Sequence, residues 1–313
     1  MFFWGAMILL VIVLAVPFVI EWTRLPLDER TRNGAPGHFA TLSQGRTHYK
    51  WHGPSEGPVV VLVHGLTTPS YVWAALLPGL TGAGYRVLRY DLYGRGFSDR
   101  PAGAQSDAFF IRQLGDLLAN QGVEGPVPLV GYSMGGSIVA AFASARPDAV
   151  SRLVLLAPAG MVHSGGRLAE FARRVPVLGD WVMYVLGGLT LIRGAAKQPG
   201  PPQLVADLSL RQRLEIQRCG YLAAVLSSQR NLLAKTLLQG HHAIAAAGLP
   251  AMAIWGADDD VIPLAAMEHL AEWNPAARHV IVEGAGHGLG YTHVDEVLEA
   301  MQAGLEVAAH KGT

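Results

Sequence analysis

The sequence contains little cysteine and little charge. Its single cysteine, Cys219, excludes an intramolecular disulfide among the 313 residues. Only 15% of the residues are charged and the formal net charge is zero, which argues against a nucleic acid as the main partner. Because the sequence also lacks paired cysteines, a His-Glu-x-x-His pattern and a spaced His/Asp cluster, we expect no metal site.

Charge is absent altogether from the segment Met1 to Ile20. Twenty apolar residues form a helix about 30 Å long, which matches the hydrocarbon thickness of a bilayer. A cleaved signal peptide normally has Lys or Arg before its apolar stretch, and none precedes this one. We therefore interpret residues 1–22 as an uncleaved transmembrane anchor, with a signal peptide and a buried core helix as the alternatives.

Basic residues follow this segment at Arg24, Arg30 and Arg32. The positive-inside rule then places the remainder of the chain in the cytoplasm. Residues 23–45 are interpreted as a linker that leads into an edge strand, because Asn33 to Gly37 has the composition of a turn.

Beyond residue 45, apolar runs alternate with helical patterns. Strands are predicted near residues 46–52, 58–64, 85–91, 126–132, 151–157, 250–256 and 278–283. Helices are predicted near residues 70–82, 107–121, 134–146, 263–273 and 291–309. This alternation predicts an α/β fold with a mostly parallel, doubly wound sheet, whose ligands bind at the carboxyl ends of the strands.

The alternation stops between residues 161 and 240. Eighty residues are too many for a structureless loop in a compact domain, and their pattern is helical. We interpret residues 161–240 as a helical cap or lid on a core formed by residues 46–160 and 241–313. Ten Lys or Arg against four Asp or Glu give this stretch a formal charge of +6, which would suit a surface of anionic lipid.

The most informative motif follows the strand predicted near residues 126–132. Residues 131–135 read Gly-Tyr-Ser-Met-Gly and open onto a helical stretch. A strand that turns sharply into a helix leaves no space for side chains beside Ser133, and glycine lacks a Cβ. The motif therefore predicts that Ser133 projects from the end of a strand above a helix N-terminus.

Four further segments at strand ends carry distinctive residues. In chain order they are residues 64–66 (His-Gly-Leu), 91–98 (Asp-Leu-Tyr-Gly-Arg-Gly-Phe-Ser), 256–263 (Gly-Ala-Asp-Asp-Asp-Val-Ile-Pro) and 284–288 (Gly-Ala-Gly-His-Gly). Together with the serine motif, they resemble the α/β-hydrolase family over about residues 40–310. The resemblance is to the group of esterases, lipases and C–C hydrolases. It implies a catalytic triad of Ser133, Asp259 and His287, in the chain order that this fold uses.

The acid of the triad has two close neighbours, Asp258 and Asp260. Only Asp259 fits the family's spacing to both Gly256 and Pro263. Among the other histidines His64 is the main rival to His287 as the base. By the resemblance, however, His64 shapes the loop that stabilises the oxyanion.

The same resemblance implies an oxyanion hole made of the backbone N–H groups of Leu66 and Met134, with Thr67 as a neighbouring candidate. It also implies that Asp91, Gly94, Gly96 and Ser98 brace loops near the site. The implied activity is that of a serine hydrolase acting on carboxylic esters without a cofactor.

Two other functions remain open at this stage. The predicted anchor favours a lipid-like ester, such as a monoacylglycerol. However, meta-cleavage C–C hydrolases share the triad, and some proteins of this fold bind ligands without catalysis. The acyl length, a thioester substrate and the oligomeric state are not decided by the sequence.

Overall fold

The computed structural model describes residues 2–162, 166–196, 205 and 207–306. Within these residues, eight strands form one sheet in the order β1-β2-β4-β3-β5-β6-β7-β8. The strands are β1 (His38–Leu42), β2 (Gly45–His52), β3 (Val59–Val63), β4 (Arg86–Tyr90), β5 (Val127–Tyr132), β6 (Val150–Leu156), β7 (Ala251–Gly256) and β8 (Arg278–Val282). At one edge, β1 pairs antiparallel with β2, and β2 pairs antiparallel with β4. All pairs from β4–β3 to β7–β8 are parallel, which confirms the expected fold class.

The stretch interpreted as a linker, residues 23–45, contains regular structure. A short helix, α2 (Glu29–Asn33), is capped by Asp28, whose side chain accepts a hydrogen bond from the N–H of Thr31 at 2.9 Å. The edge strand β1 then pairs with β2. The sequence pattern missed β1 because only Ala40 of its five residues is buried, so the strand has no clear apolar alternation.

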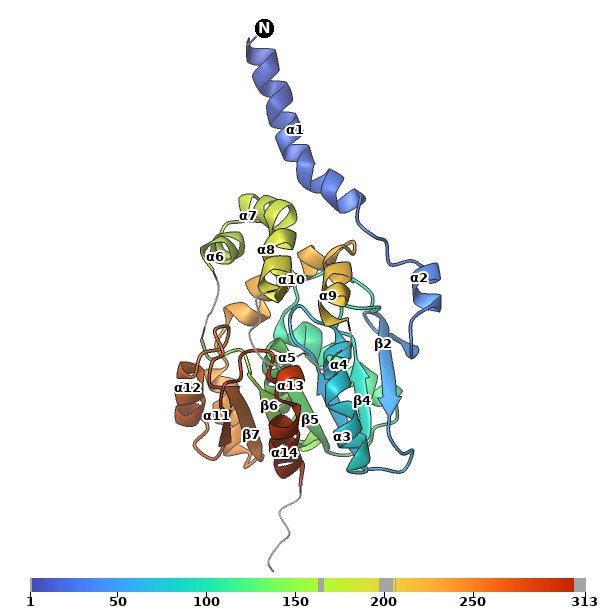
Figure 1. The fold of residues 1–313 in the computed structure, drawn as a ribbon, viewed down its shortest axis with the longest axis vertical. Coiled ribbons are helices and arrows are strands. Elements are labelled where there is room, and N and C mark those ends of the chain that lie inside the picture. Colours follow the sequence, from blue (N-terminus) through green and yellow to red (C-terminus); the bar gives the residue numbers. More distant parts are fainter. Residues whose placement is uncertain (1, 163–165, 197–204, 206, 307–313) are drawn as a thin grey trace, which may run out of the picture.

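Helices cover both faces of the sheet (Figure 1). Residues of β3 alternate between two apolar clusters: Val61 and Val63 belong to one, and Val60 and Leu62 to the other. The first cluster is completed by α4 (Asp107–Asn120), α5 (Met134–Ala145), α11 (Leu238–Ala246) and α12 (Ala265–Trp273). The second is completed by the 3₁₀-helix η1 (Ser70–Ala75), α3 (Leu77–Gly82), α13 (Leu289–Thr292) and α14 (Val294–Leu305).

Two predicted helices are divided in the structure. The stretch 70–82 is η1 followed by α3, because Pro78 fits the first turn of a new helix but cannot donate a hydrogen bond within an existing one. The stretch 291–309 is α13 and α14, and its last residues, from 307, lie outside the described part of the chain.

Between β6 and β7 the chain forms a helical layer above the carboxyl ends of the strands (Figure 1). We call the described part of residues 166–230 the insertion. It consists of α6 (Arg167–Arg174), α7 (Leu178–Val182), the π-helix η3 (Met183–Gly187), α8 (Gly188–Ala196), α9 (Leu208–Ile216) and α10 (Tyr221–Arg230). It has its own apolar cluster, which includes Met183, Tyr221 and Leu222. Residues 163–165, 197–204 and 206 of the predicted lid lie outside the described residues.

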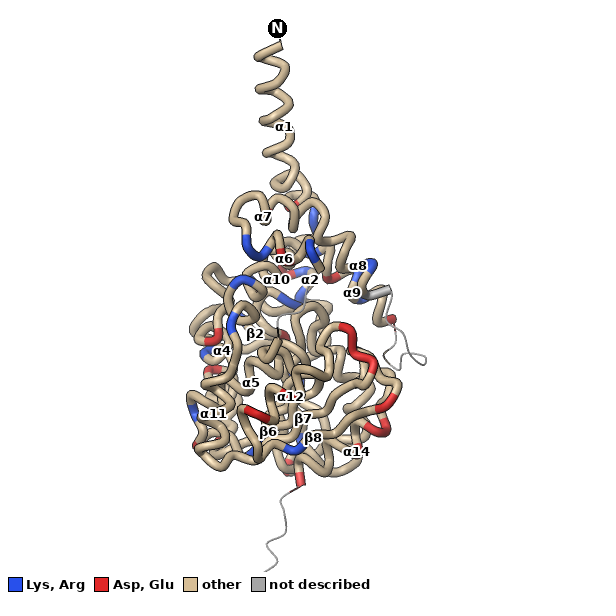
Figure 2. Tube along the Cα trace, turned by 90° about the vertical axis from the view of Figure 1, so that its left-hand side faces the viewer, with Lys and Arg blue, Asp and Glu red and all other residues tan. Residues whose placement is uncertain are grey.

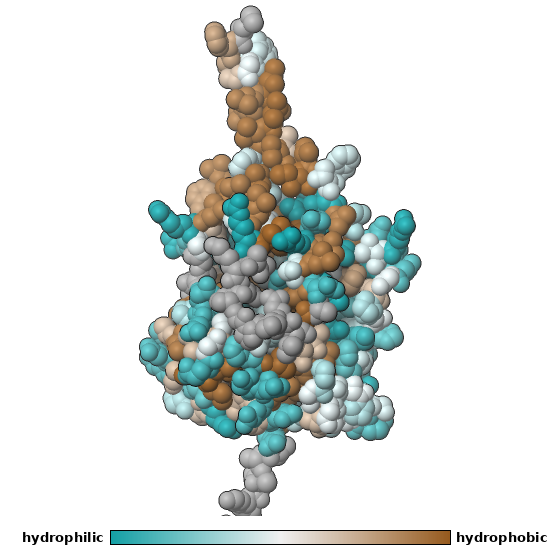
Figure 3. All heavy atoms as spheres, in the orientation of Figure 1, coloured by the Kyte–Doolittle hydropathy of each residue, from teal (hydrophilic) through white to brown (hydrophobic). Residues whose placement is uncertain are grey.

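The N-terminal helix α1 (Phe2–Trp22) projects from the insertion side of the molecule (Figure 1). None of its residues is buried, and its surface is apolar almost throughout (Figure 3). It is long and apolar enough to cross a membrane, although a signal sequence near an N-terminus has the same properties. Met1 of the predicted anchor lies outside the described residues.

Candidate active site

Ser133 is held in a sharp turn between β5 and α5. Its backbone angles are φ 53° and ψ −119°, which a residue other than glycine adopts only under strain. The flanking glycines are required by space. A Cβ on Gly131 would lie 2.4 Å from the carbonyl oxygen of Gly135, and one on Gly135 would lie 2.1 Å from that of Val63. The turn therefore presents the serine hydroxyl at the carboxyl edge of the sheet.

The structure brings the three predicted triad residues together at this edge. His287 Nε2 lies 3.1 Å from Ser133 Oγ, and His287 Nδ1 lies 2.8 Å from Asp259 Oδ2. Asp259 follows β7 and His287 follows β8, so each side chain is placed by the end of a strand. In this geometry the serine can give its proton to His287 Nε2. The carboxylate of Asp259 accepts a hydrogen bond from Nδ1 and so keeps the proton of the neutral ring on that nitrogen.

Of the three consecutive aspartates, only Asp259 has a hydrogen bond to His287. It is buried, whereas Asp258 and Asp260 are exposed. Its second carboxylate oxygen, Oδ1, accepts hydrogen bonds from the N–H groups of Val261 and Ile262, each at 2.8 Å. These bonds fix the carboxylate, so its free oxygen is aimed at the histidine.

The predicted oxyanion residues, Leu66 and Met134, lie on either side of Ser133. Met134 is the first residue of α5, so its N–H has no acceptor within the helix. Gly65 approaches so closely that a Cβ on it would lie 3.2 Å from the Cβ of Ser133, which brings the loop carrying Leu66 against the nucleophile. The two N–H groups can therefore converge on an oxygen atom of a substrate bound at the serine.

The loop that carries Leu66 is held by side chains that the sequence reasoning missed. Arg95 is fully buried, and its Nε donates to the carbonyl oxygen of Leu66 at 3.0 Å. Tyr221 of α10 donates its hydroxyl to the carbonyl oxygen of Thr67 at 2.8 Å. Burial lowers the pKa of Arg95 to about 10, which still leaves it charged near neutrality. Local sequence could not reveal these contacts, because they join segments far apart in the chain.

Both ring nitrogens of His64, the rival base, form hydrogen bonds with backbone groups. The N–H of Leu92 donates to His64 Nε2 at 2.9 Å, so the ring must donate from Nδ1 to the carbonyl oxygen of Gly65, 2.8 Å away. Complete burial lowers the pKa of His64 to about 4 and keeps it neutral. The ring therefore shapes the turn before Leu66 and has no free nitrogen for proton transfer.

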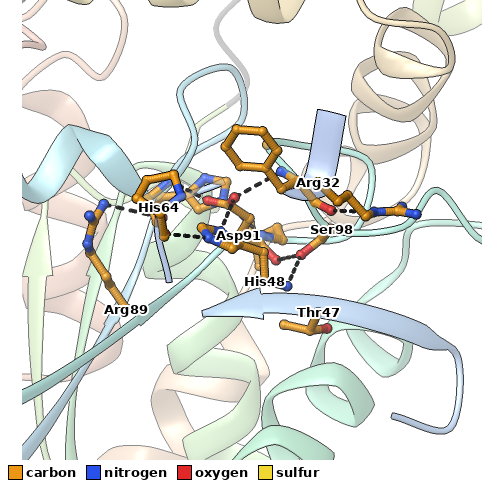
Figure 4. A network of polar contacts seen from close by, with 12 residues as sticks. Arg32, Thr47, His48, His64, Arg89, Asp91 and Ser98 are labelled. Atoms are coloured by element: carbon orange, nitrogen blue, oxygen red, sulfur yellow. Dashed lines mark hydrogen bonds and ion pairs between the residues drawn. The ribbon is translucent and has the colours of Figure 1, made fainter. Parts of the chain in front are cut away.

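Asp91 lies at the centre of a polar network beside this turn (Figure 4). Its carboxylate accepts hydrogen bonds from the N–H groups of Ser70 and Phe97, each at 3.0 Å, and from His48 Nδ1 at 2.8 Å. The hydroxyl of Ser98 donates to its backbone carbonyl at 2.6 Å. The network joins β2, the loop after β4 and the start of η1, and it does not reach Ser133.

Tyr132 was also missed by the sequence reasoning, although it lies within the serine motif. Its ring stacks on His287 with the ring centres 5.3 Å apart, and its hydroxyl donates to the backbone carbonyl of His287 at 2.6 Å. Burial raises the pKa of Tyr132 well above its usual range, so the hydroxyl remains a donor. Tyr132 thus fixes both the ring and the backbone of the histidine.

A pocket of about 380 Å³ lies above these residues, between the core and the insertion. Its apolar wall includes Leu66, Leu191, Ile216, Val261 and Tyr291. A larger pocket, of about 780 Å³, lies at the amino ends of the strands, far from the triad, and contains no comparable chemistry. In the part of the chain that the structure describes, no group of three His, Cys, Asp or Glu side chains is placed to bind a metal ion.

Comparison with known proteins places this site in a family. The model of the alpha/beta hydrolase fold matches residues 58–294, which is more than half of the chain. The protein belongs to this family, and the expected resemblance is confirmed.

Individual relatives cover the chain to different extents. A lipase of Mycobacterium tuberculosis, LipV, is 35% identical over 164 residues, which is 51% of this chain and 60% of the lipase. A 2-hydroxy-6-oxononadienedioate/2-hydroxy-6-oxononatrienedioate hydrolase of Paraburkholderia phymatum is 28% identical over 283 residues, covering 83% of this chain and 92% of that protein. Among solved structures, a carboxylesterase of Bacillus subtilis superposes with a TM-score of 0.66 at 22% identity, covering 86% of this chain and 91% of the esterase.

Proposed function

We propose that this protein is a serine hydrolase of carboxylic esters. The observation that carries the proposal is the relay from Ser133 through His287 to Asp259 at the base of an apolar pocket. Membership of the family, with a lipase and a carboxylesterase among the similar proteins, supports ester hydrolysis as the general reaction.

The first half of the reaction forms an acyl-enzyme. Ser133 Oγ attacks the acyl carbon as its proton passes to His287 Nε2, and the carbonyl oxygen becomes an oxyanion that accepts from the N–H groups of Leu66 and Met134. Asp259 stabilises the imidazolium that forms. When the tetrahedral intermediate collapses, the bond to the alcohol oxygen breaks and His287 gives its proton to the leaving alcohol.

The second half releases the acid. A water molecule attacks the acyl carbon and gives its proton to His287 Nε2, which regenerates an oxyanion in the same hole. Collapse breaks the bond to Ser133 Oγ, and the serine recovers its proton from the imidazolium. No step requires a cofactor.

The pocket favours an uncharged, apolar acyl group. Besides the apolar wall, its described lining carries Thr67, Thr68 and Gln212 but no Lys or Arg, and its one carboxylate outside the triad is that of Asp260. Such a lining binds an alkyl chain and offers no cation to an anionic substrate. Together with α1, it supports a lipid-like ester, such as a monoacylglycerol, as the substrate class.

We further propose that α1 anchors the enzyme, with the catalytic domain on the cytoplasmic side. Several Lys and Arg residues of the insertion lie near the base of α1 (Figure 2), where they would meet anionic headgroups. Full-length protein should resist carbonate extraction from membranes with its N-terminus intact. A mature protein cleaved near residue 20 would make α1 a signal peptide instead.

The C–C hydrolase remains the second candidate because of the relative from Paraburkholderia phymatum, which the chain matches over most of its length. The lining of the pocket of about 380 Å³ argues against a dicarboxylate, because it contains no Lys or Arg. Arg173 lines a smaller pocket that also reaches Ser133, but its guanidinium is already paired with Glu170 at 2.7 Å. Turnover of a meta-cleavage diketone faster than of any ester would favour this candidate.

A fluorophosphonate probe and a series of p-nitrophenyl esters test the main proposal. The probe should label the wild-type protein and fail on Ser133→Ala, and ester turnover should fall by at least ~10³-fold in that variant. Ser137→Ala is a matched control, since Ser137 is buried in α5 outside the relay. Undiminished labelling of Ser133→Ala would reject the assignment of the nucleophile.

A further inference from the structure

The anchor helix contains a carbonyl group that its own backbone cannot satisfy. Pro17 lies inside α1 and has no N–H, so the carbonyl oxygen of Val13, four residues earlier, lacks its usual helical donor. The indole Nε1 of Trp181 in α7 donates to this carbonyl at 2.8 Å. The insertion therefore supplies the hydrogen bond that the proline removes.

The end of α1 is joined to the insertion at a second place. Glu21 accepts a hydrogen bond from the N–H of Gly220 and pairs with Arg24 at 3.0 Å, and Arg24 in turn donates to the carbonyl oxygen of Ile216. Leu25 forms an isolated β-bridge to the turn between α9 and α10. Two separated contacts thus fix the helix against the insertion, so the two form one body.

The position of the upper contact limits how the helix can lie in a bilayer. From Phe2 to Val13 the helix rises only about 18 Å, which is well short of the roughly 30 Å of hydrocarbon that a spanning helix must cross. A bilayer crossed by α1 must therefore extend past Val13, and it then surrounds the part of the insertion that is docked there.

That part of the insertion has the surface such a position requires. Val177, Leu178 and Leu189 are 74%, 61% and 54% exposed, and Leu186 is also exposed. Figure 3 shows the apolar surface of α1 continuing onto this side of the insertion. In water these side chains would be a liability, whereas beside a membrane helix they meet acyl chains.

We infer that the edge formed by α7, η3 and α8 is a second membrane-inserted element, docked on the anchor at the carbonyl freed by Pro17. Its partner is the acyl-chain region of a lipid leaflet. The inference rests on the proposed anchor and deepens the proposed function. α8 carries the exposed Leu189 on this edge and Leu191 in the wall of the active-site pocket, so an ester can pass from the leaflet to Ser133 without crossing water.

The first test measures depth in full-length protein reconstituted into phosphatidylcholine–phosphatidylglycerol vesicles. In a Cys219→Ser background, a nitrobenzoxadiazole label is placed on Leu178→Cys or, as the matched control, on Ile281→Cys. Ile281 lies in β8, away from the insertion, and is 40% exposed. Doxyl-labelled lipids should quench the label at 178 and leave the label at 281 unquenched.

The docking contact is tested in the same assay by two further substitutions. Trp181→Phe removes the donor, and Pro17→Ala gives the helix its own N–H for the carbonyl of Val13. Each should reduce quenching at 178 by a similar amount, and the double variant should reduce it no further, because both break one contact. Additive losses would show that the contact is not the one that holds α7 in the bilayer.

A functional readout uses Leu178→Asp against Ile281→Asp. Leu178 is the first residue of α7, where an acidic side chain is tolerated by the helix dipole. Turnover of a long-chain ester embedded in vesicles should fall about tenfold or more in Leu178→Asp alone, because the carboxylate opposes insertion. Hydrolysis of water-soluble p-nitrophenyl acetate should be unchanged in both variants.

The outcomes separate this inference from the function on which it rests. Protein that fails to float with the vesicles would overturn the anchor and this inference together. Protein that floats and hydrolyses soluble esters, but whose label at 178 is no better quenched than the label at 281, would overturn the inference alone. Loss of soluble-ester turnover in Ser133→Ala tests the catalytic proposal independently of the anchor and of this inference.

Discussion

Two histidine–carboxylate pairs with buried carboxylates lie in the described part of this molecule, and only one of them faces a nucleophile. The Nδ1 of His287 is 2.8 Å from Asp259 Oδ2, and the same atoms of His48 and Asp91 are separated by the same distance. The pairs differ at Nε2, which in His287 lies 3.1 Å from Ser133 Oγ and in His48 lies 2.8 Å from a backbone carbonyl oxygen. What the second nitrogen meets therefore distinguishes a catalytic pair from a structural one.

The structural pair is a closed ion pair. Both ring nitrogens of His48 face acceptors, Asp91 and the carbonyl of Pro36, so both must carry protons. Burial opposes the charge of His48, but the hydrogen bond and charge of Asp91 outweigh it and raise the pKa of the imidazole. Burial likewise opposes the charge of Asp91, whose pKa is nevertheless held well below its usual range by His48. His287, by contrast, keeps Nε2 available for a proton in transit.

Removing the carboxylate of the catalytic pair should give the largest effect. In Asp259→Asn the imidazole loses the acceptor that fixes its tautomer, so kcat for a p-nitrophenyl ester should fall by ~10⁴-fold. Asp91→Asn should leave kcat within about tenfold, because its network does not contact the reacting atoms. Equal losses of kcat in the two variants would remove the distinction between the pairs.

The neighbouring aspartates sharpen the assignment of the acid. Asp258→Asn and Asp260→Asn change exposed carboxylates and should each leave kcat within about threefold. Steady-state kinetics at saturating ester measures both. If either variant is more damaging than Asp259→Asn, the geometry of the relay has been assigned to the wrong residue.

In the structural pair, by contrast, removing the carboxylate should lower the stability of the fold and not kcat. Asp91→Asn leaves the buried charge of His48 without its partner, so we expect a loss of about 3 kcal/mol in the free energy of unfolding. Urea denaturation of the detergent-solubilised protein measures it, with Asp258→Asn, which changes an exposed carboxylate, as a control that should change little. A variant as stable as the wild type would show that the pair does not hold β2 to the loop after β4.

The two pairs also show what a sequence can reveal about this site. The triad could be predicted because each member follows a strand within a short pattern, and the fold brings strand ends to one edge. His48 gave no such signal, since its pairing with Asp91 depends on the antiparallel register of β2 and β4. Arg95 and Tyr221 were missed for the same reason: they reach the loop of Leu66 across the tertiary structure.

The pH dependence of stability provides a smaller effect with a definite sign. Because the pKa of His48 is raised in the folded protein, its contribution is complete below the ordinary value of 6.5 and is lost as the pH rises through the folded value. His52 is the opposite control, since burial and the charge of Arg89 lower its pKa to about 4. Its folded form therefore loses stability as the pH falls from 6.5 towards 4.

Urea unfolding across pH 4 to 9 separates the two histidines. The difference between wild type and His48→Gln should shrink only above pH 6.5, and that between wild type and His52→Gln should change only below it. A difference for His48→Gln that is independent of pH would mean that this pair is not charged.

The smallest effect concerns the hydrogen bond from the Tyr132 hydroxyl to the backbone of His287. Tyr132→Phe keeps the ring stacked on His287 but removes the hydroxyl that donates to its backbone carbonyl at 2.6 Å. One neutral hydrogen bond contributes about 1 kcal/mol, so kcat/KM for p-nitrophenyl butyrate should fall roughly fivefold. Tyr221→Phe, which removes the donor to Thr67 on the oxyanion loop, is the matched variant and should cost a similar factor. A loss above about a hundredfold in Tyr132→Phe would mean that its hydroxyl acts on the substrate itself. No loss would mean that β8 and its loop position His287 unaided, and the two histidine pairs would then differ only in the group that each Nε2 faces.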